Sequence, residues 1–275
     1  MSFAFDGPVV LAGAGKMGGA LLSGWLAGGL KPSDILIQEP NISGEAAALA
    51  AAHGLTVVSE LPSLDRVPAA IVVAVKPQVL DAVFPPLARL AGVDTVIMSI
   101  AAGKSIASFE RHLPSGAAVV RAMPNTPAAI GRGISGAVAN ANTSASQRAV
   151  CQSLLAAVGD VVWLDQEALI DAVTAVSGSG PAYVFALVEA MTSAGVDAGL
   201  DQETAQRLAR ATVSGAGELL ARSKDDAATL RQNVTSPGGT TAAGLAVLMR
   251  EGSGLKELVS ETVLAAQKRG RELGS

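Results

Sequence analysis

The chain has 275 residues, a net charge of -4 at pH 7 and a single cysteine, Cys151. This length allows one or two domains with a large core, and the charge offers no basic surface to nucleic acid or anionic lipid. One cysteine excludes an intrachain disulfide framework and favours a reducing compartment. We therefore expect a cytoplasmic protein without a signal peptide, with no metal, no nucleic acid and no membrane among its partners.

The composition is unusually apolar, with a mean hydropathy of +0.41. A charge-free stretch such as residues 172–188 contains Gly178, Gly180 and Pro181. It is too short and too broken to cross a bilayer, which takes roughly 20 apolar residues. We attribute the apolar excess to a buried sheet, to helices covered on more than one face and to an oligomer interface.

The N-terminal half alternates short β-branched segments with helical segments. Strands are predicted at residues 9–12, 34–38, 55–58, 69–75, 94–100, 117–123 and 161–164. A glycine-ended helix is predicted at 16–29, and Ser43 is expected to cap a second helix that runs to about residue 53. Strand and helix alternation with continuous apolar strands indicates a parallel, doubly wound α/β Rossmann-type domain over residues 1–164.

Residues 165–275 contain helical patterns and no convincing strand. Breaks between the predicted helices are short. We therefore predict an all-α C-terminal domain that begins after residue 164.

The first predicted strand leads into the motif Gly13-Ala14-Gly15-Lys16-Met17-Gly18. A G-x-G-x-x-G pattern between a strand and a helix is typical of a dinucleotide site. The first glycine makes the tight turn, the second lets the backbone approach a pyrophosphate, and the third allows close packing of helix and strand. A glycine-rich turn without a ligand is the less favoured alternative.

Glu39 follows the second predicted strand and could accept hydrogen bonds from a ribose 2′-hydroxyl, which favours NADH. An acid that is merely solvated at this position is nearly as good an explanation, so both NADH and NADPH remain candidate cofactors.

Further cofactor contacts are expected where later parallel strands end, because ligands bind outside the carboxyl ends of such strands. The candidates are Ala74, Val75, Lys76 and Pro77 after one strand, and Ala101, Ala102 and Gly103 after the next. Residues 123–131, which include Asn125, predict a fixed loop at the same edge, with Asn125 as a cofactor contact. Ordinary turn chemistry is the alternative explanation for this asparagine.

The stretch NVTSPGGTTAAGL at residues 233–245 places two glycines and two threonines directly before a predicted helix. The free N–H groups at such a helix start, with the hydroxyls of Ser236, Thr240 and Thr241, predict a site for a small anion such as a carboxylate. A Ser/Thr-capped helix after a Pro-Gly turn explains the same residues equally well.

The helical half contains no histidine, since His53 and His112 both lie in the first domain. A hydroxy-acid dehydrogenase usually needs a histidine or lysine base. Reduction of a protonated imine mainly needs the substrate to be oriented beneath a nicotinamide, which favours an imine substrate here.

Several motifs in the same order resemble the Δ1-pyrroline-5-carboxylate reductase family over essentially the whole chain. They are AGAGKMGGAL, AVKPQ, SIAAG, RAMPNTPA, AVSGSGPAY and NVTSPGGTTAAGL. The resemblance implies reduction of L-1-pyrroline-5-carboxylate to L-proline by NADPH or NADH. It also implies a substrate-binding and dimerisation role for the helical domain, with a dimer or larger ring.

The resemblance assigns substrate binding to Ser236, Gly238, Gly239, Thr240 and Thr241. It implies that the backbone of this segment holds the substrate carboxylate, and that Thr241 is the catalytic residue that hydrogen-bonds the ring nitrogen. Many relatives carry Ser, Asn or Arg after the second strand, where this chain has Gln38-Glu39-Pro40-Asn41.

Two other functions fit parts of the sequence. A β-hydroxyacid dehydrogenase-like enzyme or another imine reductase shares the plan of a Rossmann domain followed by helices. The former predicts a lysine on the helix after SGSGP, and none is present. A non-catalytic NAD(P)-sensing scaffold would leave the SPGGTT segment without an explanation.

Overall fold

The computed structural model describes residues 3–274, which form two compact units. The α/β unit comprises residues 3–178 and 267–274, and the helical unit comprises residues 179–266. The last strand ends at Trp163, next to the predicted domain boundary at residue 164. The α/β unit nevertheless extends to residue 178, because Ile170 is buried in its core.

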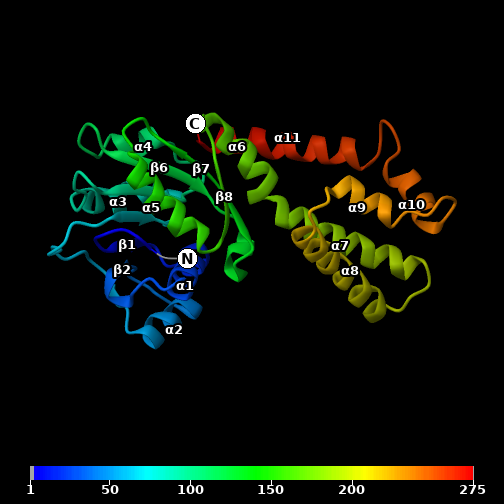
Figure 1. The fold of residues 1–275 in the computed structure, drawn as a ribbon, viewed down its shortest axis with the longest axis horizontal. Helices are drawn as coiled ribbons and strands as arrows, with labels where there is room; N and C mark the ends of the chain where they lie inside the picture. The colour runs from blue at the N-terminus through cyan, green and yellow to red at the C-terminus, as the bar shows by residue number, and fades with distance from the viewer. Residues whose placement is uncertain (1–2, 275) are drawn as a thin grey trace. The chain divides into compact units, whose positions relative to one another are not determined.

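Eight strands form one sheet in the order β3-β2-β1-β4-β5-β6-β7-β8 (Figure 1). The strands are β1 (Val9–Ala12), β2 (Ile35–Gln38), β3 (Thr56–Val58), β4 (Ala70–Val73), β5 (Val96–Ser99), β6 (Ala118–Met123), β7 (Gly133–Ala139) and β8 (Gly159–Trp163). β6 and β7 run antiparallel, and the other neighbouring strands run parallel. This order confirms the predicted Rossmann-type sheet.

Two features after β6 differ from the prediction, which had a fixed loop over residues 123–131 and no strand between residues 123 and 161. Thr126–Ile130 is a 3₁₀ helix (η3), in which Pro127 lies in the first turn. β7 was not predicted, because its sequence GISGAVA contains two glycines that weaken a strand. Packing requires both of them, since a Cβ on Gly136 would lie 2.6 Å from Val173 Cγ1 and a Cβ on Gly133 would lie 2.9 Å from the Val158 carbonyl oxygen.

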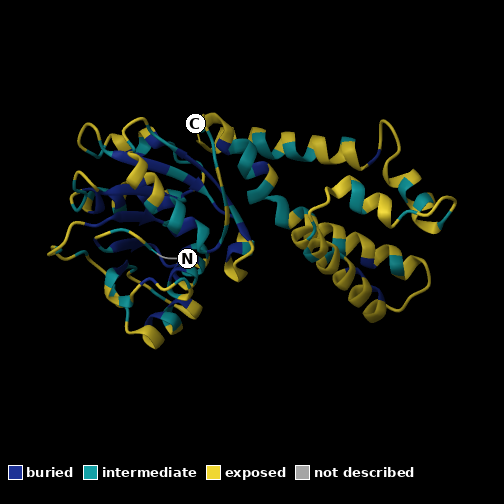
Figure 2. Cartoon of the chain, viewed as in Figure 1, coloured by how far each residue is buried: buried dark blue, intermediate teal, exposed yellow. Residues whose placement is uncertain are grey.

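Alternate residues of the strands face opposite layers of helices. On one face, Val9, Leu11 and Val72 pack with α1 (Lys16–Ala27), α2 (Gly44–His53) and α5 (Ala145–Ala156). On the other, Val10 and Ile71 pack with α3 (Leu80–Ala88), α4 (Ile106–Glu110) and α6 (Ile170–Val173). The sheet is therefore buried on both faces, as Figure 2 shows.

Shorter helical turns connect these elements. They are the 3₁₀ helices η1 (Pro32–Asp34), η2 (Pro77–Val79) and η4 (Glu167–Leu169), and a π-helical turn at Thr174–Gly178. Ser43 precedes α2 as predicted, but its hydroxyl makes no capping hydrogen bond.

The helical unit contains α7 (Gly180–Asp197), α8 (Gln202–Arg222), α9 (Ala227–Asn233), α10 (Thr240–Leu248) and the first part of α11 (Leu255–Gly274). α7 and α8 pack closely, since a Cβ on Gly195 would lie 3.1 Å from Ala205 Cβ. Most of this unit is exposed (Figure 2). Within the described residues, no helix is both long enough and apolar enough to span a bilayer.

Candidate active site

The glycine loop between β1 and α1 has the geometry of a pyrophosphate cradle. Gly13 has a φ of +92°, and a Cβ there would lie 2.8 Å from the carbonyl of Ala74, which directly follows the neighbouring strand β4. A Cβ on Gly15 would meet nothing within 4 Å, so the backbone is open to a ligand at this point. A Cβ on Gly18 would collide with the carbonyl oxygen of Gly13. Gly13 therefore permits the tight turn, Gly15 permits the approach of a pyrophosphate, and Gly18 permits the close packing of helix and strand, as the motif predicts.

The start of α1 is free to receive an anion. Gly15 is its N-cap, no side chain caps the helix, and no acidic residue lies in its first turn. Lys16 at the first helical position is exposed. Unpaired N–H groups and the positive end of the helix dipole favour phosphate here, so the residues present fit a dinucleotide.

The Glu39 side chain, which follows β2, connects the end of that strand to the glycine loop. Its Oε2 accepts a hydrogen bond from the Ala14 N–H at 3.1 Å, and its Oε1 accepts one from the Asn41 N–H at 3.1 Å. The parallel register of β1 and β2, in which Ala12 pairs with Gln38, places the two loops side by side. The carboxylate thus lies at the edge of the predicted cofactor site.

The loops after β4 and β5 lie at the same edge of the sheet. The strand order reverses between β1 and β4, which is the point where open α/β sheets bind ligands. Lys76 is exposed and Pro77 opens η2, whereas Ala101 is buried and Ala102 is exposed. Buried Ser99 accepts a hydrogen bond from the Ala101 N–H at 3.2 Å and so shapes the second loop.

Asn125 is buried, and its side-chain amide forms hydrogen bonds with two backbone groups. Its Oδ1 accepts from the Ile134 N–H at 2.9 Å, and its Nδ2 donates to the Ser177 carbonyl at 3.1 Å. These bonds join η3, β7 and the π-helical turn. The geometry supports a structural brace more strongly than the direct cofactor contact predicted for this side chain.

Arg121 is a second brace, which the sequence motifs did not single out. Its Nη1 lies 2.9 Å from Glu167 Oε1, and the same oxygen accepts from the Ile106 N–H at 2.8 Å. One carboxylate therefore ties β6, α4 and η4 together. The sequence signal was a lone arginine in an apolar strand, which needs a partner when it is buried.

The segment before α10 forms a tight turn that leaves the helix start open. Gly239 N–H donates to the Ser236 carbonyl at 3.0 Å across Pro237 and Gly238, and Gly238 has a φ of +68°. These are the positions of a type II turn. Gly239 is the N-cap of α10, with no side-chain capping bond and no acid in the first turn. Ser236, Thr240 and Thr241 are exposed, so the segment presents N–H groups and hydroxyls together.

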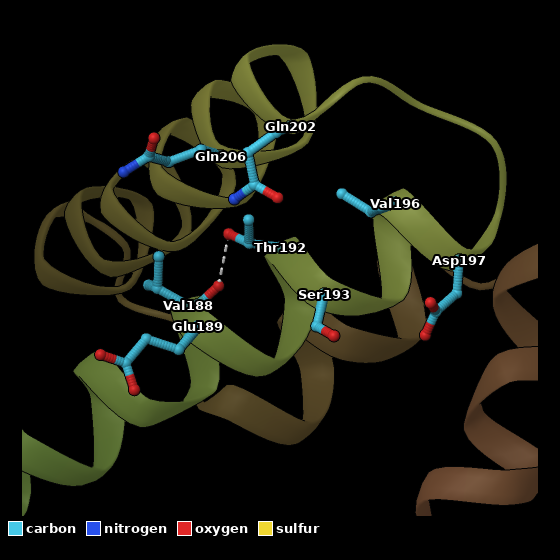
Figure 3. A pocket seen from close by; sticks show the side chains of 8 residues that line it. All are labelled: Val188, Glu189, Thr192, Ser193, Val196, Asp197, Gln202 and Gln206. Carbon is cyan, nitrogen blue, oxygen red and sulfur yellow. Dashed lines mark hydrogen bonds between the residues drawn. The ribbon is translucent and has the colours of Figure 1, made fainter.

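A hollow of about 340 Å³ lies elsewhere in the helical unit, between α7 and α8. Figure 3 shows that its wall is formed by side chains of α7, among them Glu189 and Asp197, and of α8. The Thr192 hydroxyl in this wall donates to the Val188 carbonyl of its own helix at 2.8 Å. The 236–241 segment takes no part in this hollow.

Comparisons with known proteins agree with this arrangement. A family model described as "Pyrroline-5-carboxylate reductase dimerisation" matches residues 167–273, and one described as "NADP oxidoreductase coenzyme F420-dependent" matches residues 8–103. The pyrroline-5-carboxylate reductase of Pseudomonas aeruginosa is 43% identical over 265 residues, which cover 96% of each chain. The chain belongs to the pyrroline-5-carboxylate reductase family. The enzyme of that name from Synechocystis is 41% identical over 96% of this chain and 97% of its own.

Solved structures of the pyrroline-5-carboxylate reductase family share the fold over nearly the whole chain. The protein from Coxiella burnetii is 31% identical with a TM-score of 0.90, and the alignment covers 98% of this chain and 100% of that one. The Plasmodium falciparum protein, solved with NADP bound, is 29% identical with a TM-score of 0.80 and covers 98% and 99%. The family predicted from the motifs is thus confirmed, as is the self-association expected of a chain with its dimerisation domain.

Proposed function

We propose that this chain is a pyrroline-5-carboxylate reductase, which reduces L-1-pyrroline-5-carboxylate to L-proline with NAD(P)H in the last step of proline biosynthesis. One observation carries the proposal. The N-terminus of α10 is left open behind a Ser-Pro-Gly-Gly turn, beside two threonine hydroxyls. That combination suits a small substrate with a carboxylate next to a ring nitrogen.

Binding and orientation of the substrate are the proposed work of residues 236–241. The N–H groups of Gly239, Thr240 and Thr241 would hold the carboxylate at the positive end of α10. The Thr241 hydroxyl would hydrogen-bond the ring nitrogen and so fix the ring for attack at its C=N carbon. The nicotinamide, when bound, supplies the hydride.

Two helices, α7 and α10, lack the lysine or histidine base that alcohol oxidation usually needs. α7 contains no lysine and α10 contains neither lysine nor histidine. This composition disfavours a β-hydroxyacid dehydrogenase-like reaction and is compatible with an imine, which is already electrophilic when protonated.

Assembly through the helical unit is part of the proposal. We expect a dimer, alone or as the building block of a larger ring, because this unit exposes large apolar side chains such as Phe185 and Leu258.

The first test is NADH and NADPH oxidation, measured with and without pyrroline-5-carboxylate. Oxidation that depends on the pyrroline supports the proposal. Cofactor binding without turnover would contradict it and would favour a sensing protein or another imine substrate.

The second test concerns Thr241. Replacement of Thr241 by Val keeps its shape and removes the hydroxyl, whereas Thr241→Ser keeps the hydroxyl. We expect Thr241→Val and Thr241→Ala to lower kcat/KM for the pyrroline by up to about 10²-fold, and Thr241→Ser to retain most of it. The dissociation constant of the cofactor should stay nearly unchanged. Equal losses of catalysis and cofactor affinity would rule out the assigned role.

A further inference from the structure

The surroundings of Glu39 bear on whether the proposed enzyme uses NADH or NADPH. Glu39 follows β2 directly, and the Gly13 N–H donates to the Gln38 carbonyl at 3.0 Å. The Glu39 carboxylate therefore lies against the glycine loop, where Oε2 holds the Ala14 N–H. A dinucleotide with its pyrophosphate at the start of α1 places its adenosine ribose beside the end of the second strand.

We propose that Glu39 makes this enzyme select NADH over NADPH, by accepting hydrogen bonds from the adenosine ribose hydroxyls and excluding a 2′-phosphate. This inference rests on the proposed function and deepens it. Each carboxylate oxygen accepts one backbone N–H and keeps a second acceptor site. Those sites suit the two hydroxyl donors of an unmodified ribose.

A 2′-phosphate would find no lysine or arginine in the segment that contains β2 and Glu39. Residues 32–65 contain the acids Asp34, Glu39, Glu45, Glu60 and Asp65 and no lysine or arginine. Glu45 lies in the first turn of α2, so a second carboxylate follows close along the chain after Glu39. A phosphate beside Glu39 would therefore meet like charge.

Lys31 and Arg66 flank this segment in the sequence, and both lie near the start of β2, whereas Glu39 follows its end. Lys31 precedes η1, and η1 leads into the start of β2 rather than its end. Arg66 pairs with Asp34 at 3.0 Å and with Asp6 at 2.6 Å, so it is held at the start of β2.

The backbone N–H groups near Glu39 already donate hydrogen bonds to its carboxylate. The Asn41 N–H, which could otherwise contribute to binding of a phosphate, donates to Glu39 Oε1 at 3.1 Å. The Ala14 N–H in the glycine loop donates to the other oxygen. To bind these two N–H groups, the 2′-phosphate of NADPH would have to displace the Glu39 carboxylate from both of them.

The test measures binding of NADH and NADPH separately, by calorimetry or by nicotinamide fluorescence, without any pyrroline present. We expect the wild type to bind NADH roughly 10- to 100-fold more tightly than NADPH. Glu39→Gln removes the charge at nearly constant shape and should lower this ratio at least about 10-fold, by weakening NADH and strengthening NADPH. Glu45→Gln is the matched control, since Glu45 makes no bond to the glycine loop, and should change the ratio little.

Two results would overturn the inference. A wild type that binds NADPH as tightly as NADH would exclude selection by Glu39. An equal loss of both affinities in Glu39→Gln would mean that this side chain only braces the glycine loop. Because no substrate is used, failure of the pyrroline assay would leave this measurement valid.

Discussion

Gly15 and Gly18 stand three positions apart in the glycine loop, yet a methyl group would have different effects at the two. At Gly15 it would point into open space, and at Gly18 it would strike the Gly13 carbonyl oxygen. Gly15 has a φ of -69°, which alanine adopts without strain. The first position therefore matters for a ligand, and the second matters for the fold.

This difference predicts separate consequences for two alanine variants. Gly15→Ala should keep the melting temperature of the wild type but weaken NADH binding at least about 10-fold, since the methyl group occupies the space of the pyrophosphate. Gly18→Ala should lower the free energy of unfolding by about 1–3 kcal/mol through overpacking.

Gly19→Ala is the control for both, because a Cβ there would make an ordinary 3.5 Å contact with Ala46. Thermal melts and cofactor titrations distinguish the effects. Wild-type NADH affinity in Gly15→Ala would show that no pyrophosphate lies against this loop.

Helix starts differ in their capping at the scale of elements, and α2, α3, α6 and α7 have no side-chain capping bond although their N-caps are not glycine. α4, α5, α8 and α9 are capped by the side chains of Ser105, Ser144, Asp201 and Asp226. α1 and α10 begin instead at Gly15 and Gly239, without a capping side chain. At each capped start the side chain accepts a hydrogen bond from one of the otherwise free N–H groups. The two open glycine starts coincide with the predicted phosphate and carboxylate sites.

The capped helices predict a dependence of stability on acid pH. Hydrogen bonds from the backbone N–H groups of Thr204 and Thr229 lower the pKa of the Asp201 and Asp226 carboxyls below its usual value. A lowered pKa in the folded state stabilises the protein above the unfolded pKa of about 4, and this stabilisation is lost as the pH falls through the folded value.

Replacement of Asp226 by Asn should therefore lower the melting temperature at pH 7, and the difference from the wild type should shrink toward pH 3. Circular dichroism melts across this range measure the effect. Asp225→Asn is the control, since Asp225 does not cap α9. A difference that stays constant with pH would contradict a charged cap.

The two units of the whole molecule differ sharply in burial. The α/β unit has a core on each face of its sheet, with fully buried Trp25 and Phe84. Within described residues 179–266, only Ala205 and Ala209 are buried hydrophobic residues. Phe185, Leu258 and Leu264 are about 60% exposed. So much exposed apolar surface indicates cover by another copy of the chain.

An aspartate at Leu258 should weaken self-association, because it puts a charge on the apolar surface of α11. Val93→Asp is the matched control, since Val93 is 93% exposed in the α/β unit. Light scattering on a size-exclusion column should show that the wild type and the Val93→Asp variant are oligomers. The Leu258→Asp variant should elute as a smaller species. A monomeric wild type would contradict the interface.

The sequence by itself determined the parts of this protein that local chemistry controls. Continuous apolar strands predicted seven of the strands of the sheet, and glycine spacing predicted the loop at Gly13, Gly15 and Gly18. The turn at Gly238 could also be expected, because proline followed by glycine favours a type II turn.

Only the tertiary structure decided what depends on residues far apart in the chain. β7 is a strand because β6 and β8 pair with its glycine-containing sequence, and such pairing overrides a weak local preference. The amide of Asn125 found its partners at Ile134 and Ser177, which no local pattern specifies. Glu39 reached the Ala14 N–H because parallel pairing of β1 and β2 brought two loops together.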